Sequence, residues 1–496
     1  MTVFLVGAGP GDPGLLTVRG AELLACADVV VYDRLAPVAL LDLVPRDAER
    51  VYVGKGPGHV EMSQADINDV LVARGQQGLA VVRLKGGDPY VFGRGGEETE
   101  ALAAAGVAFE VVPGVTSAIA AAAYAGIPVT HRGLSTHVTV VTGHEDPART
   151  EPGVDWDALA RAGGTLVILM GAGRIADIAA ALIAGGRAPG TPVAAVRNGT
   201  RADQRTVRAT LATIAGAGVR APSAIVVGEV AGLDLRWFEN RPLFGRRVVV
   251  TRAREQASAL RARLEALGAT VIELPAIVLE PVDFEVPPLA GYGWLVLTSA
   301  NGVAALFDRG LAPAGLDTRA LAGVRVAAIG PGTAAALAAR GVRADLVPDR
   351  FVAEALVAAF PPPEPGRERV LLARAKQARD VLPEGLAARG YRVDVLPVYR
   401  TVRAEPDADA LAAVQAGEID AVTFTSSSTV TNLCDLLGDV LPARPTLIAS
   451  IGPVTSATAR ERGLTVDVEA SEHTIDGLVA ALVAAFAAAP RRRVGT

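Results

Sequence analysis

Side chains that can release a proton near neutral pH are scarce in this chain of 496 residues, because nearly all of its basic residues are arginine. The only lysines are Lys55, Lys85 and Lys376. An arginine stays protonated under working conditions, whereas a lysine can act as an acid or a base once its surroundings shift its pKa. The lysines therefore indicate where proton transfer could take place, although chance retention would produce the same pattern.

Two glycine-rich segments could bring the backbone close to a ligand. In VRLKGGDPYVFGRGGEE, residues 82–98, Gly86 and Gly87 follow an apolar run and place no Cβ between the chain and a ligand. This segment is no phosphate-binding P-loop, because its lysine precedes the glycines. In FLVGAGPGDPG, residues 4–14, Asp12 occupies the place of the third glycine that a dinucleotide-binding turn needs. The pattern therefore argues against an NAD-dependent dehydrogenase.

These segments need a scaffold of strands and helices to hold them. Short β-rich runs alternate with alanine- and leucine-rich stretches along the chain, as in VVVYD (29–33) and TLVILM (165–170). This alternation predicts an α/β architecture with largely parallel sheets, in which ligands bind at the carboxyl ends of the strands. The chain is too long for one core, and the segment RWFENRPLFGRR (236–247) marks the predicted domain boundary.

Composition narrows the class of protein. The net charge of -5 and the pI near 5.7 argue against nucleic acid as a partner. Cys26 and Cys434 match neither a disulfide nor a metal-ligand spacing, so we expect no metal and a reducing cytoplasm. The sequence shows no signal-peptide pattern, and its apolar stretch at 478–489 is too short for a membrane span, so we expect no membrane partner.

The second half of the chain repeats itself. Three blocks recur in the same order: VVVTRAREQA with VLLARAKQAR, VLTSANGV with TFTSSSTV, and AAIGPGTA with ASIGPVTS. This order predicts a duplicated α/β unit with a ligand cleft between two lobes. Four strand-to-helix turns in these blocks direct backbone N–H groups beyond the strands, which suits a ligand with several anionic groups. The alternative for each turn is an ordinary helix N-cap.

The first half carries a series of motifs that together resemble the tetrapyrrole methylase family. They are GAGPGDPGLLT (7–17), KGGDPYVFGRGGEE, VPGVTSA (112–118), AGIPVTHR (125–132), VTGH and LMG. The resemblance covers about residues 1–232 and is closest to the uroporphyrinogen-III C-methyltransferases. It implies a two-lobed α/β methylase fold, a homodimer, and S-adenosyl-L-methionine as the cofactor, held between the lobes.

Site residues follow from this resemblance position by position. The proton-transferring pair would be Asp33 and Lys55, each of which comes soon after a predicted strand. The cofactor contacts would lie in strand-end loops, at Pro10, Gly86, Gly87, Asp88, Val91, Thr116, Ser117, Met170 and Gly199. The carboxylates of the substrate would be bound by Arg34, Arg94, His131 and Arg132. Met170 could instead fill a core at a strand end, and the charged residues could be plain surface groups.

The second half, about residues 245–489, resembles the uroporphyrinogen-III synthases. The motifs are VTRAREQA, LTSANGV, IGPGTA, LPVYRT, FTSSSTV and IGPVTS. The resemblance implies two interleaved lobes, one formed by about 245–279 with 403–489 and the other by the segment between them. Tyr399 would help a hydroxyl group leave, with a half-buried structural tyrosine as the alternative. The turns would bind substrate carboxylates through Thr298, Ser299, Thr333, Ser427 and Thr455.

Together the two resemblances imply a bifunctional cytoplasmic enzyme, with a methylase domain at 1–238 and a synthase domain at 245–489. The synthase would close hydroxymethylbilane to uroporphyrinogen III with loss of water. The methylase would then methylate that product twice, through precorrin-1 to precorrin-2. The alternatives are a methylase that acts on another precorrin and a C-terminal half that only binds tetrapyrroles. Whether precorrin-2 feeds sirohaem or cobalamin stays open.

Overall fold

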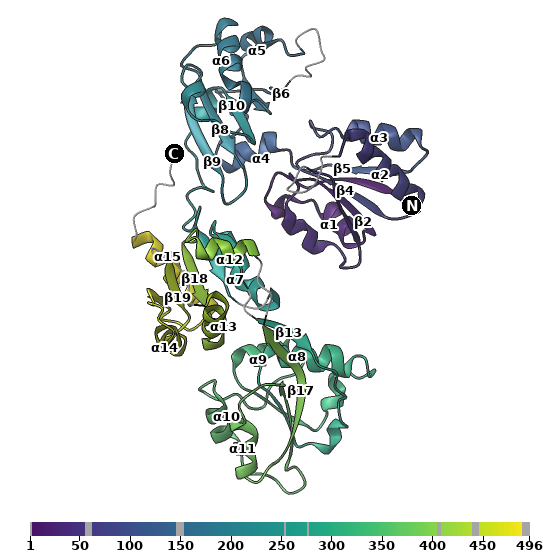
Figure 1. Cartoon of the computed structure of the whole chain (residues 1–496), viewed down its shortest axis with the longest axis vertical. Coiled ribbons are helices and arrows are strands. Elements are labelled where there is room, and N and C mark those ends of the chain that lie inside the picture. Colours follow the sequence, from purple (N-terminus) through teal and green to yellow (C-terminus); the bar gives the residue numbers. More distant parts are fainter. Residues whose placement is uncertain are drawn as a thin grey trace. The chain divides into compact units, whose positions relative to one another are not determined.

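The computed structural model describes residues 2–54, 62–144, 153–251, 254–274, 277–403, 408–438 and 446–488 (Figure 1). The strands of these residues form four five-stranded β-sheets. The chain divides into two compact units. The first consists of Met1–Arg247, Arg263–Thr270 and Phe486–Thr496, and the second of Val248–Ala262 and Val271–Ala485. Two of the sheets belong to the first unit, and the strands of the other two lie almost wholly in the second.

The first sheet is parallel throughout and has the strand order β3-β2-β4-β1-β5. Its strands are β1 (Val3–Gly7), β2 (Val29–Tyr32), β3 (Glu49–Tyr52), β4 (Val81–Lys85) and β5 (Phe109–Val112). Alternate side chains of β2 enter different cores: Val29 and Val31 pack with α2 (Gln64–Gln76) and α3 (Gly95–Ala104), and Val30 packs with α1 (Val18–Ala25). Helices on both faces explain why this strand is an unbroken run of valine.

The second sheet is mixed and has the order β6-β7-β10-β8-β9. Strands β6 (Val138–Thr142) and β7 (Thr165–Leu169) are parallel, whereas the other neighbours pair antiparallel. These others are β8 (Pro192–Arg197), β9 (Arg205–Thr210) and β10 (Ser223–Val227). The prediction of largely parallel sheets is therefore wrong here. Only residues 198–204 join β8 to β9, and parallel neighbours need a crossover of about a dozen residues or more.

Helices cover both faces of this second sheet. Helix α4 (Ser117–Tyr124) shares one core with Val167 of β7, and α5 (Trp156–Ala162) and α6 (Ile175–Ala184) share the other core with Ile168. Helix α4 directly follows β5 of the first sheet, so the segment between them carries the chain from one sheet to the next.

The strands of the C-terminal half interleave, as the resemblance implied. Strand β11 (Arg247–Val250) pairs in parallel with β18 (Ala421–Phe424), in a sheet of order β12-β11-β18-β19-β20. The intervening segment forms the sheet β13-β17-β16-β14-β15, whose edge strand β13 (Ile277–Pro281) runs antiparallel to β17 (Arg392–Arg403). The remaining strands are β12 (Thr270–Glu273), β14 (Trp294–Leu297), β15 (Arg325–Ala328), β16 (Arg369–Ala375), β19 (Leu447–Ser450) and β20 (Val468–Glu469).

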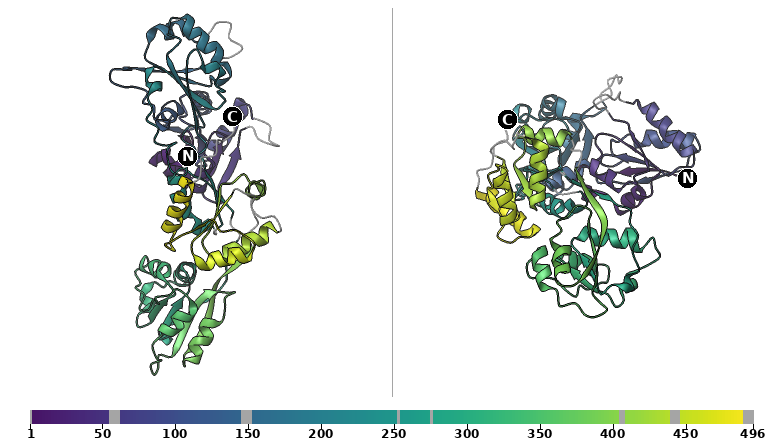
Figure 2. Two further views of the ribbon diagram at one scale, coloured as in Figure 1. Left: turned by 90° about the vertical axis from the view of Figure 1, so that its left-hand side faces the viewer. Right: turned by 60° about the horizontal axis from the view of Figure 1, so that its bottom comes forward.

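Helices lie on both faces of the sheet β13-β17-β16-β14-β15, which we call the middle sheet (Figure 2). Helices α8 (Ala300–Ala305) and α9 (Pro331–Ala338) share one core, and α10 (Ala353–Ala359) and α11 (Val381–Ala388) share the other. The other helices of this half are α7 (Arg254–Ala266), α12 (Ala408–Gln415), α13 (Ser427–Leu437), α14 (Pro453–Glu461) and α15 (Ile475–Ala488). Among the described residues, no helix has the length and the apolar character that a bilayer crossing requires.

Three loops at the carboxyl ends of the first sheet touch backbone to backbone. A Cβ on Gly7 would stand 2.5 Å from the amide nitrogen of Gly114 and 2.8 Å from the carbonyl oxygen of Gly87, and a Cβ on Gly114 would collide with that same oxygen. Gly87 has a left-handed φ of +72°. Its amide donates to the Gly9 carbonyl at 2.8 Å, and the Gly9 amide donates back at 3.2 Å. Only glycine allows this approach.

The variant Gly114→Ala tests this packing. We expect the unfolding midpoint of the N-terminal unit to fall by about 2–10 °C, because the new Cβ meets backbone atoms that no rotamer change can move. Gly96→Ala is the matched control, since a Cβ there meets nothing within 4 Å inside α3, and it should keep or slightly raise the midpoint. Differential scanning calorimetry measures both, and equal midpoints would contradict the packing argument.

Candidate active sites

The loops after β1, β4 and β5 form the first candidate site. The Asp88 carboxylate accepts hydrogen bonds from the amides of Tyr90 at 2.8 Å and Gly114 at 2.9 Å, and so ties the β4 loop to the β5 loop. Thr116 caps α4, and a Cβ on Gly87 would lie 3.8 Å from the amide of Ser117. The structure thereby gathers six of the predicted cofactor residues around the glycine loops: Pro10, Gly86, Gly87, Asp88, Thr116 and Ser117.

Of the other three predicted cofactor residues, one lies further along the loop after β4 and two lie on loops that follow strands of the second sheet. Val91 is exposed on the loop after β4. Met170 follows β7 with a left-handed φ of 56° and is 52% exposed, so the alternative that it fills a core is wrong. Gly199 follows β8 and lies against α4, where a Cβ would stand 2.9 Å from the Cα of Ala121.

Three residues, Asp12, Tyr124 and Thr200, join the β1 loop to α4 and the second sheet, and we call this group the Asp12 clasp. The Tyr124 hydroxyl at the end of α4 donates to Asp12 Oδ2 at 2.7 Å, and the amide of Asp12 donates to Thr200 Oγ1 at 3.0 Å. Burial, and then the bond to the Asp12 carboxylate, raises the pKa of Tyr124, so this hydroxyl remains a donor. The aspartate that replaces the third glycine of a dinucleotide turn therefore holds two parts of the unit together.

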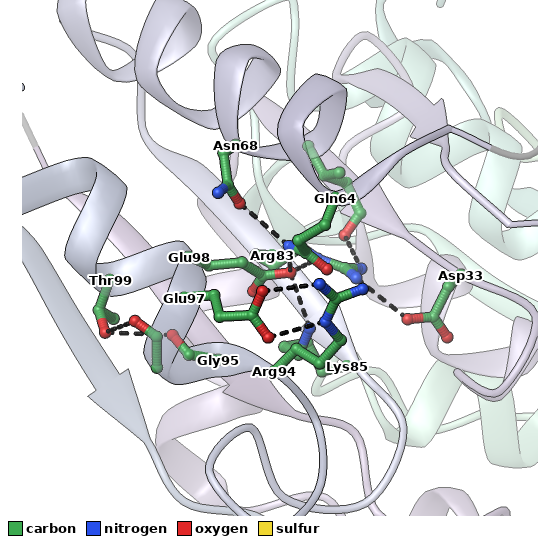
Figure 3. A network of polar contacts seen from close by, with 12 residues as sticks. Asp33, Gln64, Asn68, Arg83, Lys85, Arg94, Gly95, Glu97, Glu98 and Thr99 are labelled. Atoms are coloured by element: carbon green, nitrogen blue, oxygen red, sulfur yellow. Dashed lines mark hydrogen bonds and ion pairs between the residues drawn. The ribbon is translucent and has the colours of Figure 1, made fainter. Parts of the chain in front are cut away.

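Asp33 lies at the carboxyl end of β2, beside a buried group of charges (Figure 3). Its Oδ2 atom accepts from Arg83 at 3.1 Å, and its Oδ1 atom accepts from the amide of Leu35 at 3.0 Å. Arg83 also contacts the buried carboxylate of Glu98, which pairs with Lys85 at 2.8 Å. Asp33 is thus a partly exposed carboxylate whose two oxygens are both oriented by donors.

The predicted partner of Asp33, Lys55, lies outside the described residues. Gly54, which precedes it, approaches the β2 loop, because a Cβ there would stand 2.9 Å from the amide of Arg34. The predicted substrate-binding residues Arg34, Arg94, His131 and Arg132 are all exposed. Arg94 is paired with Glu97 through two hydrogen bonds of 2.8 and 2.6 Å, and this pairing raises the pKa of Arg94.

A second candidate site lies in the middle sheet of the C-terminal half. Tyr399 of β17 is half-buried, and its hydroxyl lies 3.1 Å from the hydroxyl of Ser299. Ser299 also caps α8, since its Oγ atom accepts from the amide of Gly302 at 2.9 Å. That oxygen keeps a second lone pair and its own proton, so either hydroxyl can donate to the other.

The four strand-to-helix turns divide into two kinds. Ser299 and Ser426 bond back to the first turns of α8 and α13, so the N-cap alternative holds for these two. Helices α9 and α14 begin after Gly330 and Gly452 with no side-chain cap. The predicted contacts differ accordingly. Thr298 and Ser427 are partly exposed, whereas Thr333 and Thr455 are buried, with only 5% of each residue exposed.

Comparison with known proteins identifies the family of each half of the chain. The family "Tetrapyrrole (Corrin/Porphyrin) Methylases" matches residues 2–215, and the family "Uroporphyrinogen-III synthase HemD" matches residues 258–480. The "Porphyrin biosynthesis protein HemD" of Ruminiclostridium josui is 38% identical over 490 residues, which cover 96% of this chain and 96% of the relative. The chain is a tetrapyrrole methylase joined to a uroporphyrinogen-III synthase.

Two relatives match the methylase half alone. The S-adenosyl-L-methionine-dependent uroporphyrinogen III methyltransferase of Methanosarcina barkeri is 56% identical over 235 residues, 47% of this chain and 92% of the relative. The crystal structure of uroporphyrin-III C-methyl transferase from Thermus thermophilus complexed with S-adenyl homocysteine is 42% identical and covers 47% of this chain and 99% of its own, with a TM-score of 0.41. Both resemblances inferred from the motifs are confirmed by the family matches.

Sequence reasoning missed four residues of the methylase half. Arg83 and Glu98 lie on either side of the GGDP loop within the motif at residues 82–98, but the sequence gives no sign that their side chains are in contact. Tyr124 and Thr200 are 76 positions apart and both contact Asp12. The unexpected aspartate at the glycine position was the one signal that could have prompted a search for its partners.

The clasp around Asp12 generates a test in the methylase half. Tyr124→Phe keeps the ring contacts with Trp237 and Phe238 and removes only the hydroxyl. We expect a loss of about 1–2 kcal/mol of stability, because the bond to a charged acceptor disappears. Thermal unfolding of Tyr124→Phe, Thr200→Val and the double variant should give non-additive losses, since both bonds hold the same loop. Fully additive losses would show that the two bonds act independently.

Proposed function

We propose that the synthase half closes hydroxymethylbilane to uroporphyrinogen III with loss of water, and that the methylase half transfers two methyl groups to this product, giving precorrin-2 through precorrin-1. The observation that carries the proposal is the union in one chain of a uroporphyrinogen-III synthase family match and a methylase half that is 56% identical to a uroporphyrinogen III methyltransferase. The product of one half is then the substrate of the other.

The glycine loops fit S-adenosyl-L-methionine as the cofactor. They leave the backbone bare at the carboxyl ends of β1, β4 and β5, and the Asp12 clasp brings the β8 loop beside them. When bound, the cofactor supplies a methyl group that is already activated on a positive sulfur. Asp88 suits this charge, because its carboxylate is held in place by two backbone amides. We retain as proposed contacts Pro10, Gly86, Gly87, Asp88, Val91, Thr116, Ser117, Met170 and Gly199.

Asp33 is the proposed proton acceptor in methyl transfer. A pyrrole carbon that gains a methyl group makes the ring shed or move a proton, and a fixed carboxylate at a strand end can accept it. Arg83 and the Leu35 amide orient both oxygens of this carboxylate. Lys55 is proposed as its partner. The substrate carboxylates are assigned to Arg34, Arg94, His131 and Arg132, whose charged or polar heads are exposed.

Tyr399 is the proposed catalytic residue of the synthase half. We assign Ser299 as the donor in its contact with Tyr399, so that the tyrosine keeps its own proton for the departing hydroxyl of the bilane. The uncapped first turns of α9 and α14 suit the eight carboxylates of this substrate. Thr298, Ser299, Thr333, Ser427 and Thr455 remain the proposed contacts, and the buried pair among them acts through the backbone of its turns.

The proposed domains are residues 1–238 and 245–489. The first boundary is supported by Phe238, which packs on Tyr124 with ring centroids 4.8 Å apart and so belongs with α4. We also propose a homodimer through the methylase half and a cytoplasmic location. Two free cysteines, Cys26 and Cys434, suit a reducing compartment.

The first experiment supplies hydroxymethylbilane to the purified protein under anaerobic conditions, with and without S-adenosyl-L-methionine. We expect type III uroporphyrinogen without the cofactor and a product two methyl groups heavier with it, identified by mass and isomer analysis. If the reaction without the cofactor yields only the type I isomer, which forms spontaneously, the C-terminal half is a tetrapyrrole-binding module and not a synthase. If the type III product is never methylated but another precorrin is, that precorrin is the substrate of the methylase half.

A crossed pair of variants assigns the two activities. Asp33→Asn should lower kcat for methylation by about 10²- to 10⁴-fold, because the amide cannot accept the proton. Its formation of uroporphyrinogen III should not change. Tyr399→Phe should slow bilane closure and leave methylation of added uroporphyrinogen III intact. Each variant is the folding control for the other, and loss of both activities in either one would contradict the assignment.

A further inference from the structure

A buried group of charged side chains lies beneath Asp33. Arg83 and Lys85 of β4 are exposed by only 3% and 4%, and Glu98 of α3 is exposed by 0%. Burying three charges is costly in free energy unless each of them is paired. The proposed mechanism uses neither Lys85 nor Glu98, so their burial beside the proton acceptor calls for a physical reason.

Glu98 holds both cations with a single oxygen. Its Oε1 atom accepts from Lys85 Nζ at 2.8 Å, from Arg83 Nε at 3.2 Å and from Gln64 Nε2 at 3.4 Å. Its Oε2 atom has no hydrogen-bond partner among the described residues. Burial, and then the Arg83 charge, lowers the pKa of Lys85, and the Glu98 carboxylate opposes this shift. Glu98 is therefore the anion that lets two cations lie close together on one strand.

Arg83 connects this anion to Asp33. While its Nε atom donates to Glu98, one terminal nitrogen donates to Asp33 Oδ2 at 3.1 Å. The other terminal nitrogen donates to the carbonyls of Val31 at 3.4 Å and Leu84 at 3.2 Å. All three nitrogens are engaged, and Figure 3 shows the guanidinium between the two carboxylates. Glu98 thus helps to fix the orientation of the Arg83 guanidinium, which in turn holds the Asp33 carboxylate.

We infer that Glu98 is a positioning residue for methyl transfer and that it acts through Arg83 on the carboxylate of Asp33. The inference rests on the proposed role of Asp33 in proton transfer. With a neutral side chain at position 98, Arg83 would keep Asp33 as its one carboxylate partner among the described residues. Asp33 would then be drawn toward β4 and would lose the orientation in which it accepts the proton.

The variant Glu98→Gln tests this inference, because glutamine keeps an oxygen acceptor and loses the charge. The purified full-length protein receives uroporphyrinogen III and S-adenosyl-L-methionine directly. We expect kcat to fall by about 10- to 100-fold while both KM values change by less than about 3-fold, since a small misplacement impairs the reaction step more than binding. Glu100→Gln, an exposed glutamate on the same helix, is the matched control and should keep wild-type kcat and KM.

The double variant Lys85→Gln/Glu98→Gln separates an effect through Arg83 from the effect of an unpaired Lys85 charge. It removes the cation that Glu98→Gln leaves without its counter-charge but still leaves Arg83 without Glu98, so we expect its kcat to stay about 10- to 100-fold below that of the wild type. A role of Glu98 limited to neutralising Lys85 predicts recovery of kcat to the wild-type value instead. If Glu98→Gln does not fold, the double variant is compared with the wild type by the same criterion.

The outcomes separate the inference from the function on which it rests. Wild-type kcat in Glu98→Gln would overturn the inference, and so would recovery of the wild-type kcat in the double variant. A wild-type protein that methylates nothing under these conditions would refute the proposed methylase function itself.

Discussion

The contact of backbone with backbone at Gly7, Gly87 and Gly114 is the constraint on which the methylase half depends. Three loops from different parallel strands end at the same edge of the first sheet, and they can meet only where no Cβ intervenes. The close fit leaves Asp88 near enough to bridge the β4 and β5 loops, and it starts α4 at Ser117. Through α4 the geometry of the first sheet reaches the second, where Tyr124 returns a hydrogen bond to the β1 loop.

Burial of charge imposes a second constraint at the same edge. β4 carries Arg83 and Lys85 into the interior on a strand that is otherwise apolar, and such cations need a carboxylate within reach. Glu98 meets this need from the first turn of α3, next to the GGDP loop that lines the candidate cofactor site. The position of the glycine loop and the orientation of the Asp33 carboxylate are therefore linked physically, because the strand that ends in this loop also carries the arginine that holds Asp33.

The C-terminal half shows how a duplication can be built into two lobes. The repeated blocks match element for element: β11, α7 and β12 correspond to β16, α11 and β17, and β14 and β15 correspond to β18 and β19. The strand orders agree as well, since β12-β11-β18-β19 matches β17-β16-β14-β15. Each sheet therefore combines the first block of one copy with the later blocks of the other. This exchange keeps the strand order of the repeated unit in both lobes, and the chain crosses between the lobes twice.

The sequence by itself determined the families, the α/β class, the duplication and the glycine-rich loops, because motifs and alternating patterns are local properties of the chain. It predicted that Asp33 follows a strand, but it could not reveal that Arg83 joins Asp33 to Glu98, that Tyr124 bonds to Asp12, or that Ser299 lies beside Tyr399. It also mispredicted the parallel course of the second sheet. Those features depend on which strands become neighbours and which side chains meet across the fold. Only the tertiary structure decides them, since packing and charge pairing act between residues far apart in sequence.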